Sequence, residues 1–348
     1  MPGTKVAVAL SGGADSAAAA LLLKEAAHEV TGIHMRLCDS TGSDLQARRA
    51  EDICRVLDIP CHEVDLRKEF ESRVVDYFCR EYQQGRTPNP CVACNRTMKF
   101  GLLLDKALSM GADYLATGHY ARVKHSADGQ RLLKAADTRR DQSYFLYTLT
   151  QEKLGHVLFP LGGRSRDDVR QIVEQARLPV ATRSSQDTCF ISRKNQSGFL
   201  AQRLGTRSGD IVDMAGELLG HHRGIAFYTL GQRHGLGLAS GQPLYIIRIE
   251  AESNRIVLGP QNELYSRELT VRDLHWVSGE PPPEPIAATA KIRYRSKEAD
   301  ATLVFKDGSV VVHFTQPQKA VTPGQSVVFY NRDEVLGGAI IDSAGTGA

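Results

Sequence analysis

The sequence contains no stretch of about 20 consecutive apolar residues, which is the length that a membrane-spanning helix needs. Nor does it begin with the charged and then apolar pattern of a secretory signal, because residues 6–10 form a short strand-like run that ends in Ser-Gly-Gly. The net charge is only +3, so the overall balance neither demands nor excludes a polyanionic partner. We therefore expect a soluble, cytoplasmic protein without membrane contact.

Cysteine is scarce and odd in number, with seven thiols in 348 residues. A cytoplasmic chain of this length can bury a core in two or three domains and does not need a disulfide framework to fold. Any cysteine with a special role is therefore expected to be catalytic, redox-active or metal-binding.

The first half of the chain alternates short β-branched runs with helical patterns. Strands are expected at residues 5–10, 29–35, 62–64 and 114–117, and helices at about 16–27, 44–57, 69–84 and 99–110. Such alternation predicts an α/β fold with a doubly wound, Rossmann-like parallel sheet. Ligands are expected at the carboxyl ends of its strands.

From about residue 205 the pattern changes to short apolar runs separated by glycine and turn residues, which is typical of small β-barrels or sandwiches. We place a further boundary near residues 260–266, because strand patterns resume clearly after it. The expected domains are residues 1–204, a small β-rich domain at 205–264, and a C-terminal β-barrel at 265–348.

The first strand leads into the loop Ser-Gly-Gly-Ala-Asp-Ser at residues 11–16 and then into an alanine-rich helix. Glycines allow close backbone approach, and the positive end of a helix attracts a phosphate. Ser11 and Ser16 add hydroxyl donors, and Asp15 is suited to hold Mg²⁺ against a pyrophosphate. The lysine of a Walker A loop is missing. The alternative is an ordinary turn in which Asp15 caps the helix.

Two further segments carry cysteines in polar surroundings. Cys91 and Cys94 form a Cys-x-x-Cys between two prolines and a predicted helix, whose N-terminus would lower the pKa of Cys94. Cys189 lies in a polar run at residues 184–190, with Arg183 and Arg193 close in sequence. A metal site, a redox pair and structural thiols all remain open. A lone Cys-x-x-Cys is a weak metal signal because a closed site requires four ligands.

The loop at residues 11–16 resembles that of the PP-loop pyrophosphatases, which cleave ATP between its α and β phosphates. With the downstream motifs, the chain resembles the bacterial tRNA-specific 2-thiouridylases from residue 5 to about residue 341. The resemblance rests on residues 9–16, 32–35, 87–100, 116–120, 134–137, 141–146, 185–190 and 228–233.

This resemblance implies a sulfurtransferase reaction. ATP would adenylate the C2 oxygen of the wobble uridine of certain tRNAs, and sulfur from a cysteine persulfide would then displace AMP to give 2-thiouridine. Cys189 would carry the persulfide, which a cysteine desulfurase or sulfur-relay protein would supply, and Cys94 would form a disulfide with it. The implied ATP-binding residues are Ala9, Leu10, Ser11, Gly12, Gly13, Ala14, Asp15, Ser16, Met35 and Gly118.

The target base would lie among Asn89, Pro90 and Cys91 by the same resemblance. Basic residues beside hydrogen-bonding or stacking groups, as at residues 139–142 and 291–295, suit single-stranded RNA loops. The implied tRNA-binding residues are His119, Arg140, Asp141, Gln142, Arg293, Tyr294, Arg295 and Gln325.

Many members of this family carry an aspartate, a plausible acid–base group, where this chain has Cys91. The third thiol makes Cys91, Cys94 and Cys189 a possible ligand set for an iron–sulfur cluster with one open iron. A persulfide relay and a cluster-dependent thiolation both remain open. An amide-forming PP-loop synthetase and a non-catalytic RNA- or metal-binding protein would also fit the loop at residues 11–16, but neither explains the cysteines well.

Overall fold

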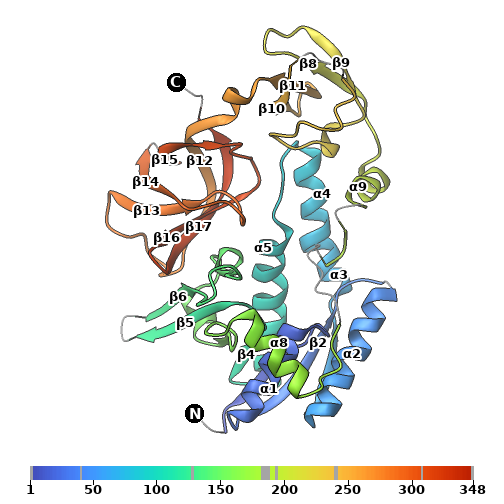
Figure 1. Cartoon of the computed structure of the whole chain (residues 1–348), viewed down its shortest axis with the longest axis vertical. Helices are drawn as coiled ribbons and strands as arrows, with labels where there is room; N and C mark the ends of the chain where they lie inside the picture. Colours follow the sequence, from blue (N-terminus) through green and yellow to red (C-terminus); the bar gives the residue numbers. More distant parts are fainter. Residues whose placement is uncertain are drawn as a thin grey trace.

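The structure is a computed structural model that describes residues 3–39, 41–126, 129–181, 189–192, 195–238, 242–306 and 309–345. Figure 1 shows an α/β domain at the bottom, a C-terminal barrel on the left and a small sheet at the top. In the described residues, every helix is too short or too polar to cross a membrane.

The α/β domain contains a five-stranded sheet in the order β3-β2-β1-β4-β7, and all its strand pairs are parallel. The strands are β1 (Lys5–Ala9), β2 (Glu29–Arg36), β3 (Cys61–Asp65), β4 (Tyr114–Ala116) and β7 (Val157–Leu158). The expected Rossmann-like sheet is confirmed. Its strand order reverses between β1 and β4, so the loops after these two strands diverge and leave a crevice at the carboxyl edge.

Helices cover both faces of this sheet. Val6 and Val8 on β1 are buried with α1 (Ala14–Glu25), α2 (Thr41–Leu57) and α8 (Arg166–Gln175). Ala7 points to the opposite face and packs with the helices after residue 95. This division follows from the two-residue period of a strand. The four alanines at residues 17–20 are fully buried, so α1 lies close to the sheet.

The helix that carries Cys91 and Cys94 begins at Pro90, and not near Lys99 as expected. It runs without interruption through α5 (Pro90–Cys94), the π-helix η2 (Asn95–Leu103) and α6 (Leu104–Ser109). Asn89 caps it by accepting a hydrogen bond from the backbone N–H of Val92 at 3.3 Å, and proline is favoured at the first helical position. The Cys-x-x-Cys is therefore inside the helix and not ahead of it.

A second long helical segment consists of α3 (Arg67–Phe70), η1 (Glu71–Val75) and α4 (Asp76–Gln83). Shorter pieces complete the α/β region and the linkers. They are η3 (Ser143–Phe145), α7 (Gln151–Leu154), α9 (Gln196–Leu204), η4 (Ile225–Phe227) and η5 (Gln261–Leu264).

The remaining strands form two β structures, as expected from the glycine-punctuated pattern. The small sheet contains β8 (Gly209–Val212), β9 (Leu218–His222), β10 (Tyr245–Glu250) and β11 (Arg255–Gly259). The barrel contains β12 (Tyr265–Trp276), β13 (Ile286–Lys291), β14 (Ala299–Lys306), β15 (Ser309–Lys319), β16 (Ser326–Asn331) and β17 (Glu334–Ala344). Its first and last strands pair with each other, which closes the barrel.

The barrel sheet also includes a hairpin from the α/β domain, formed by β5 (Ala121–Ser126) and β6 (Gly129–Lys134). Leu133 of β6 pairs with Glu334 of β17, so the two domains share a hydrogen-bonded edge. This shared edge fixes the barrel beside the crevice.

Candidate active site

The crevice is part of a cavity of about 1940 Å³ at the carboxyl edge of the sheet. One end is formed by the loop at residues 11–16, and the other by Cys91, Cys94 and Cys189. Pockets for drug-sized ligands are typically about 300–1,000 Å³. This cavity is therefore large enough for a nucleotide together with a second group of similar size.

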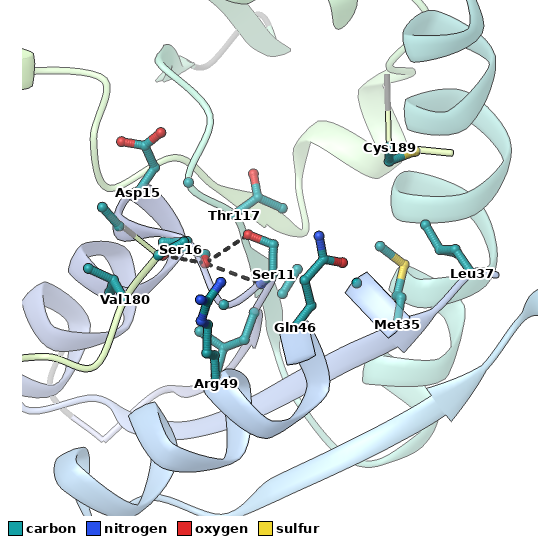
Figure 2. Close-up of a pocket in the computed structure, with 18 of the residues that line it drawn as sticks. Ser11, Asp15, Ser16, Met35, Leu37, Gln46, Arg49, Thr117, Val180 and Cys189 are labelled. Carbon is teal, nitrogen blue, oxygen red and sulfur yellow. Dashed lines mark hydrogen bonds between the residues drawn. The ribbon is translucent and has the colours of Figure 1, made fainter. Parts of the chain in front are cut away.

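The loop after β1 is arranged to receive an anion. Gly12 has φ +73°, and the N-cap residue Gly13 has no side chain that could accept hydrogen bonds from the first turn of α1. Ser11 donates its backbone N–H to the hydroxyl of Ser16 at 3.2 Å, and the two hydroxyl oxygens are also 3.2 Å apart (Figure 2). Free N–H groups and hydroxyls at a positive helix end favour phosphate.

Asp15 is exposed at the start of α1, and its carboxylate accepts a hydrogen bond from the hydroxyl of Tyr120 at 2.9 Å. Tyr120 remains protonated because burial and the nearby Asp15 charge raise its pKa. A Cβ atom on Gly118 would lie only 2.7 Å from the backbone of Asp15. Only glycine allows this close approach between the segment after β4 and the phosphate loop.

All the residues expected to bind ATP line the cavity. Those that have not yet been placed come from the ends of β1 and β2 and the start of α1: Ala9, Leu10, Ala14 and Met35. The arrangement provides an apolar wall beside a phosphate-binding end.

Arg49 and Gln46 also line this end, although their positions in the sequence gave no sign of it. Figure 2 shows both side chains extending from α2 toward Ser11 and Ser16. A Cβ on Gly12 would lie 3.0 Å from the Cβ of Arg49, so α2 lies directly against the loop. Arg49 has no ion pair within the described residues, which leaves its charge available to an anion in the cavity.

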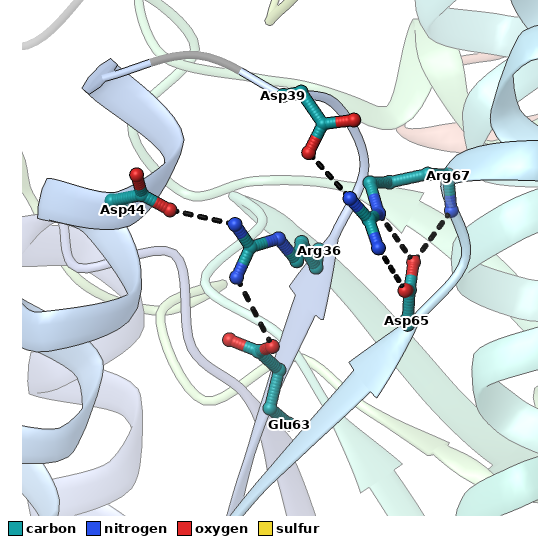
Figure 3. A network of polar contacts seen from close by, with 6 residues as sticks. All are labelled: Arg36, Asp39, Asp44, Glu63, Asp65 and Arg67. Atoms are coloured by element: carbon teal, nitrogen blue, oxygen red, sulfur yellow. Dashed lines mark hydrogen bonds and ion pairs between the residues drawn. The ribbon is translucent and has the colours of Figure 1, made fainter.

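A polar network holds the start of α2 near the sheet (Figure 3). Arg36 at the end of β2 pairs with Asp44 of α2 at 2.7 Å and with Glu63 of β3 at 3.6 Å. Beside it, Arg67 binds Asp65 at 2.6 Å and also Asp39. The guanidinium of Arg67 lowers the pKa of Asp65 to about 2, so this carboxylate stays ionised at neutral pH.

The thiols of Cys94 and Cys189 are in hydrogen-bonding contact at the other end of the cavity, and neither is in a disulfide. Cys94 is buried, whereas Cys91 and Cys189 are exposed to the cavity. The hydrogen bond from Cys189, with a smaller effect of the Lys99 charge, lowers the pKa of Cys94 below its usual value against the effect of burial. The same contact, together with desolvation by the surrounding cavity wall, raises the pKa of Cys189.

Cys94 and Cys189 are distant in the sequence, yet the folded chain itself places them in contact. We expected a helix N-terminus to lower the pKa of Cys94, but this residue is the last one of α5, and the hydrogen bond from Cys189 is the main cause of its shift. The nearby cation is Lys99, which no sequence motif indicated. Arg183, Arg193 and the run at residues 184–188 lie outside the described residues.

The residues expected around the target base differ in position. Pro90 and Cys91 line the cavity, while Asn89 caps α5. The pKa of Cys91 is raised by desolvation, so it remains a neutral thiol. Gln325 of the barrel donates to the backbone carbonyls of Thr87 at 2.9 Å and Pro88 at 3.3 Å, and so holds the loop that leads into the helix.

The expected tRNA contacts near β4 are mostly buried. His119 packs against Phe100 and Phe159, and burial lowers its pKa well below the usual value, so it is neutral. It lines the cavity, as does Gln142. Asp141 is buried and accepts hydrogen bonds from the backbone N–H groups of Ala135 and Ser143 and from the hydroxyl of Ser143. Because these bonds occupy its carboxylate, we do not retain it as a direct tRNA contact.

The basic segment at residues 291–295 connects the barrel with the α/β domain. Arg293 donates to the carbonyl of Lys319 at 2.7 Å, and the ring of Tyr294 lies 4.5 Å from that of Phe145. Phe145 itself lines the cavity. Arg295 is exposed and Arg140 half-buried, so these two side chains are the more accessible of the expected phosphate contacts.

An iron–sulfur cluster does not fit the described residues. They contain no group of three or more His, Cys, Asp or Glu side chains arranged to hold a metal ion, although Cys91, Cys94 and Cys189 share one cavity. The observed contact is instead a thiol–thiol hydrogen bond, which suits the exchange of sulfur between two cysteines.

Comparison with known proteins identifies three matched segments. Family profiles match residues 4–193 ("tRNA methyl transferase HUP domain"), 197–260 ("tRNA methyl transferase PRC-barrel domain") and 266–341 ("Aminomethyltransferase beta-barrel domain"). The chain is 45% identical to the tRNA-specific 2-thiouridylase MnmA of Acetivibrio thermocellus, over 97% of this chain and 99% of that protein. It is 46% identical to the enzyme of the same name from Syntrophomonas wolfei, with the same coverage.

Among solved structures, a partial match is the U34-tRNA thiolase NcsA of Methanococcus maripaludis, which contains a [4Fe-4S] cluster. It is 20% identical, covers 58% of this chain and 67% of that chain, and has a TM-score of 0.38. A likeness this distant carries no argument about the site or its cofactor.

Proposed function

Because the chain belongs to the tRNA-specific 2-thiouridylase family, we propose that its cavity is the site where a tRNA wobble uridine is adenylated and then thiolated. The observation that supports this most directly is the contact between Cys94 and Cys189 in the cavity that contains the phosphate loop. The name of the matched profile refers to methyl transfer, but the relatives that are 45% and 46% identical over 97% of this chain are named 2-thiouridylases, which supports sulfur transfer.

In the first step, the chain holds ATP so that the C2 oxygen of uridine can attack the α-phosphorus. The O–P bond forms, the bond to the β-phosphate breaks, and pyrophosphate leaves. The free N–H groups of α1, the hydroxyls of Ser11 and Ser16, and Arg49 are placed to bind the phosphates. Asp15 would hold a magnesium ion, which neutralises phosphate charge when bound.

In the second step, a persulfide on Cys189 supplies sulfur. Its terminal sulfur attacks C2 of the uridine, the C2–O bond breaks, and the bonding electrons leave with AMP. The Cys94 thiolate then attacks Sγ of Cys189, so the S–S bond breaks and its electrons remain on the sulfur attached to C2. The products are 2-thiouridine and a Cys94–Cys189 disulfide. A dithiol reductant must restore the thiols, and a persulfide donor must reload Cys189.

For tRNA binding, we retain the residues that are accessible from the cavity or near its rim. Pro90 and Cys91 would contact the target base. Further contacts would come from His119, Gln142, Arg140, Arg293, Tyr294 and Arg295. Asn89 and Gln325 would act indirectly, because they hold the loop and helix that present Cys91.

The test is nucleoside analysis of tRNA incubated with the protein, ATP, magnesium and a persulfide donor. We expect 2-thiouridine at the wobble position with the unaltered protein and with Cys61→Ala, whose thiol is outside the cavity. Cys94→Ala and Cys189→Ala should give none while still binding ATP. Multiple turnover without bound iron would support the cluster-free reaction. Full activity of either cavity variant would contradict the sulfur relay.

A further inference from the structure

Lys99 is the one lysine among the described residues that line the cavity. It belongs to η2, one π-helical turn after Cys94, and is half-buried. No ion pair or hydrogen bond of its ammonium group is found within the described part of the chain. Within the described residues its charge therefore has no partner, and the three thiols and the neutral His119 line the same cavity.

The π-helix explains why Lys99 faces the same space as the catalytic thiols. Its hydrogen bonds connect residues five apart, instead of the four of an α-helix. Cys94 and Lys99 are separated by five positions, so the wider turn brings them to the same face. In a regular α-helix Lys99 would point well away from Cys94. Such irregular turns are frequent at functional sites.

Lys99 is close enough to the thiols to act on them electrostatically. Its charge favours the ionised forms of Cys91, Cys94 and Cys189, and it disfavours protonation of His119. The arginines that line the cavity come from other elements, namely α2, α8 and the segment after α8: Arg49, Arg166, Arg170 and Arg177. Lys99 is therefore the cation associated with the thiol end.

The chemistry of the second step places the leaving group beside this cation. A sulfur atom that attacks C2 must approach to about 3–3.5 Å, and the departing oxygen is bonded to that same carbon. A positive charge next to the thiols is therefore also next to the C2–O–P linkage. When that bond breaks, the linking phosphate gains negative charge as AMP leaves, and a fixed cation stabilises such developing charge.

We propose that Lys99 is a catalytic residue whose ammonium group binds the phosphate that joins AMP to the uridine and stabilises AMP as it leaves. This role rests on the proposed thiolation. The competing explanation is that Lys99 only packs its aliphatic stem against the helix while its charged end reaches solvent. Lys99→Met separates the two, because methionine keeps an unbranched apolar stem and removes the charge.

The first measurement is the single-turnover rate of 2-thiouridine formation with persulfide-loaded protein and saturating ATP. Lys99→Met should lower this rate about 10²–10³-fold, the effect of removing one transition-state donor. Lys99→Arg should recover part of the loss because it restores the charge. The control is Lys106→Met, because Lys106 is an exposed residue of α6 outside the cavity, and its rate should equal that of the unaltered protein. A Lys99→Met rate within about threefold of the original would overturn the proposal.

The second measurement compares AMP with adenosine as ligands and needs no tRNA. Lys99→Met should weaken the binding of AMP roughly tenfold, as expected for the loss of one charge-assisted contact, and leave the affinity for adenosine unchanged. Equal weakening of both ligands would mean that Lys99 acts through packing, and the proposal would be wrong. If the unaltered protein formed no 2-thiouridine, the function itself would fail, whereas the AMP comparison would still test whether Lys99 binds this phosphate.

Discussion

Cys91 and Cys94 are three residues apart in one helix and differ in acidity because of what each side chain touches. Desolvation raises the pKa of Cys91, while the hydrogen bond from Cys189 lowers that of Cys94. The lowered pKa favours the thiolate of Cys94, the form that attacks an S–S bond. Cys91, which remains a thiol, is better suited to contact the base than to transfer sulfur.

The contribution of Arg49 to phosphate binding can be tested by removing its side chain. Arg49→Ala should weaken ATP binding roughly 10- to 100-fold, because a charge-assisted bond to the outer phosphates is worth about 1.5–3 kcal/mol. AMP, which lacks these phosphates, should bind as before. Calorimetric titration of both ligands provides the measurement, and Arg48→Ala is the control because that side chain is exposed outside the cavity. Equal losses for ATP and AMP would contradict this placement of Arg49.

Among the elements, the helix that begins at Pro90 does most to organise the site. Its α5 segment presents Cys91 and Cys94, and its π-helical segment η2 presents Lys99. The sequence contained the start signal, Asn89 followed by Pro90, but a Cys-x-x-Cys that directly follows two prolines resembles a loop. The change from α to π is not visible in the residue pattern, because it depends on packing against the neighbouring elements.

The contact between the segment after β4 and α1 can be tested with Gly118→Ala. The added Cβ would lie 2.7 Å from the backbone of Asp15 and 2.8 Å from that of Ser16, so the phosphate loop must shift. Overpacking of this kind costs about 1–3 kcal/mol, and we expect ATP affinity to fall about tenfold or more. The control is Gly163→Ala, where the added Cβ meets no atom within 4 Å. Unchanged ATP affinity of Gly118→Ala would show that the loop tolerates the shift.

For the whole molecule, the barrel is held against the α/β domain by polar as well as backbone contacts. Glu81 at the end of α4 is buried and pairs with Arg272 of β12 at 2.9 Å. Arg272 also lies 3.7 Å from Asp342 of β17. Together with the hydrogen bond from Gln325 to the backbone of Thr87, these contacts fix the barrel relative to the helix that carries Cys91 and Cys94.

Removing the charge of Glu81 should therefore lower the stability of the folded protein. We expect Glu81→Gln to lower the free energy of unfolding by about 1–3 kcal/mol, because the partner arginine loses a buried, charged acceptor. Glu174→Gln, which breaks the exposed pair with Arg170, should change it by less than about 1 kcal/mol. Urea denaturation followed by tryptophan fluorescence reports on the barrel, since Trp276 belongs to β12. Equal stability of the two variants would contradict this role.

The sequence by itself determined the fold class and the family. Alternating strand and helix patterns predict the parallel sheet, the glycine-punctuated strands predict the β structures, and both are observed. The loop at residues 11–16 was also predictable, because its glycines and serines act through the backbone of one short segment. These features depend on local periodicity and on neighbouring residues, which a sequence displays directly.

Only the tertiary structure decided which side chains share the cavity. Cys94 and Cys189 are distant in sequence, yet their thiols touch. Lys99 and Arg49 belong to different helices, and both extend into the same cavity. Asp141, which the resemblance implied as an RNA contact, is buried and hydrogen-bonded to Ala135 and Ser143. Burial, hydrogen-bond partners and the charge that acts on a thiol all depend on packing between distant segments, and no local pattern of residues encodes them.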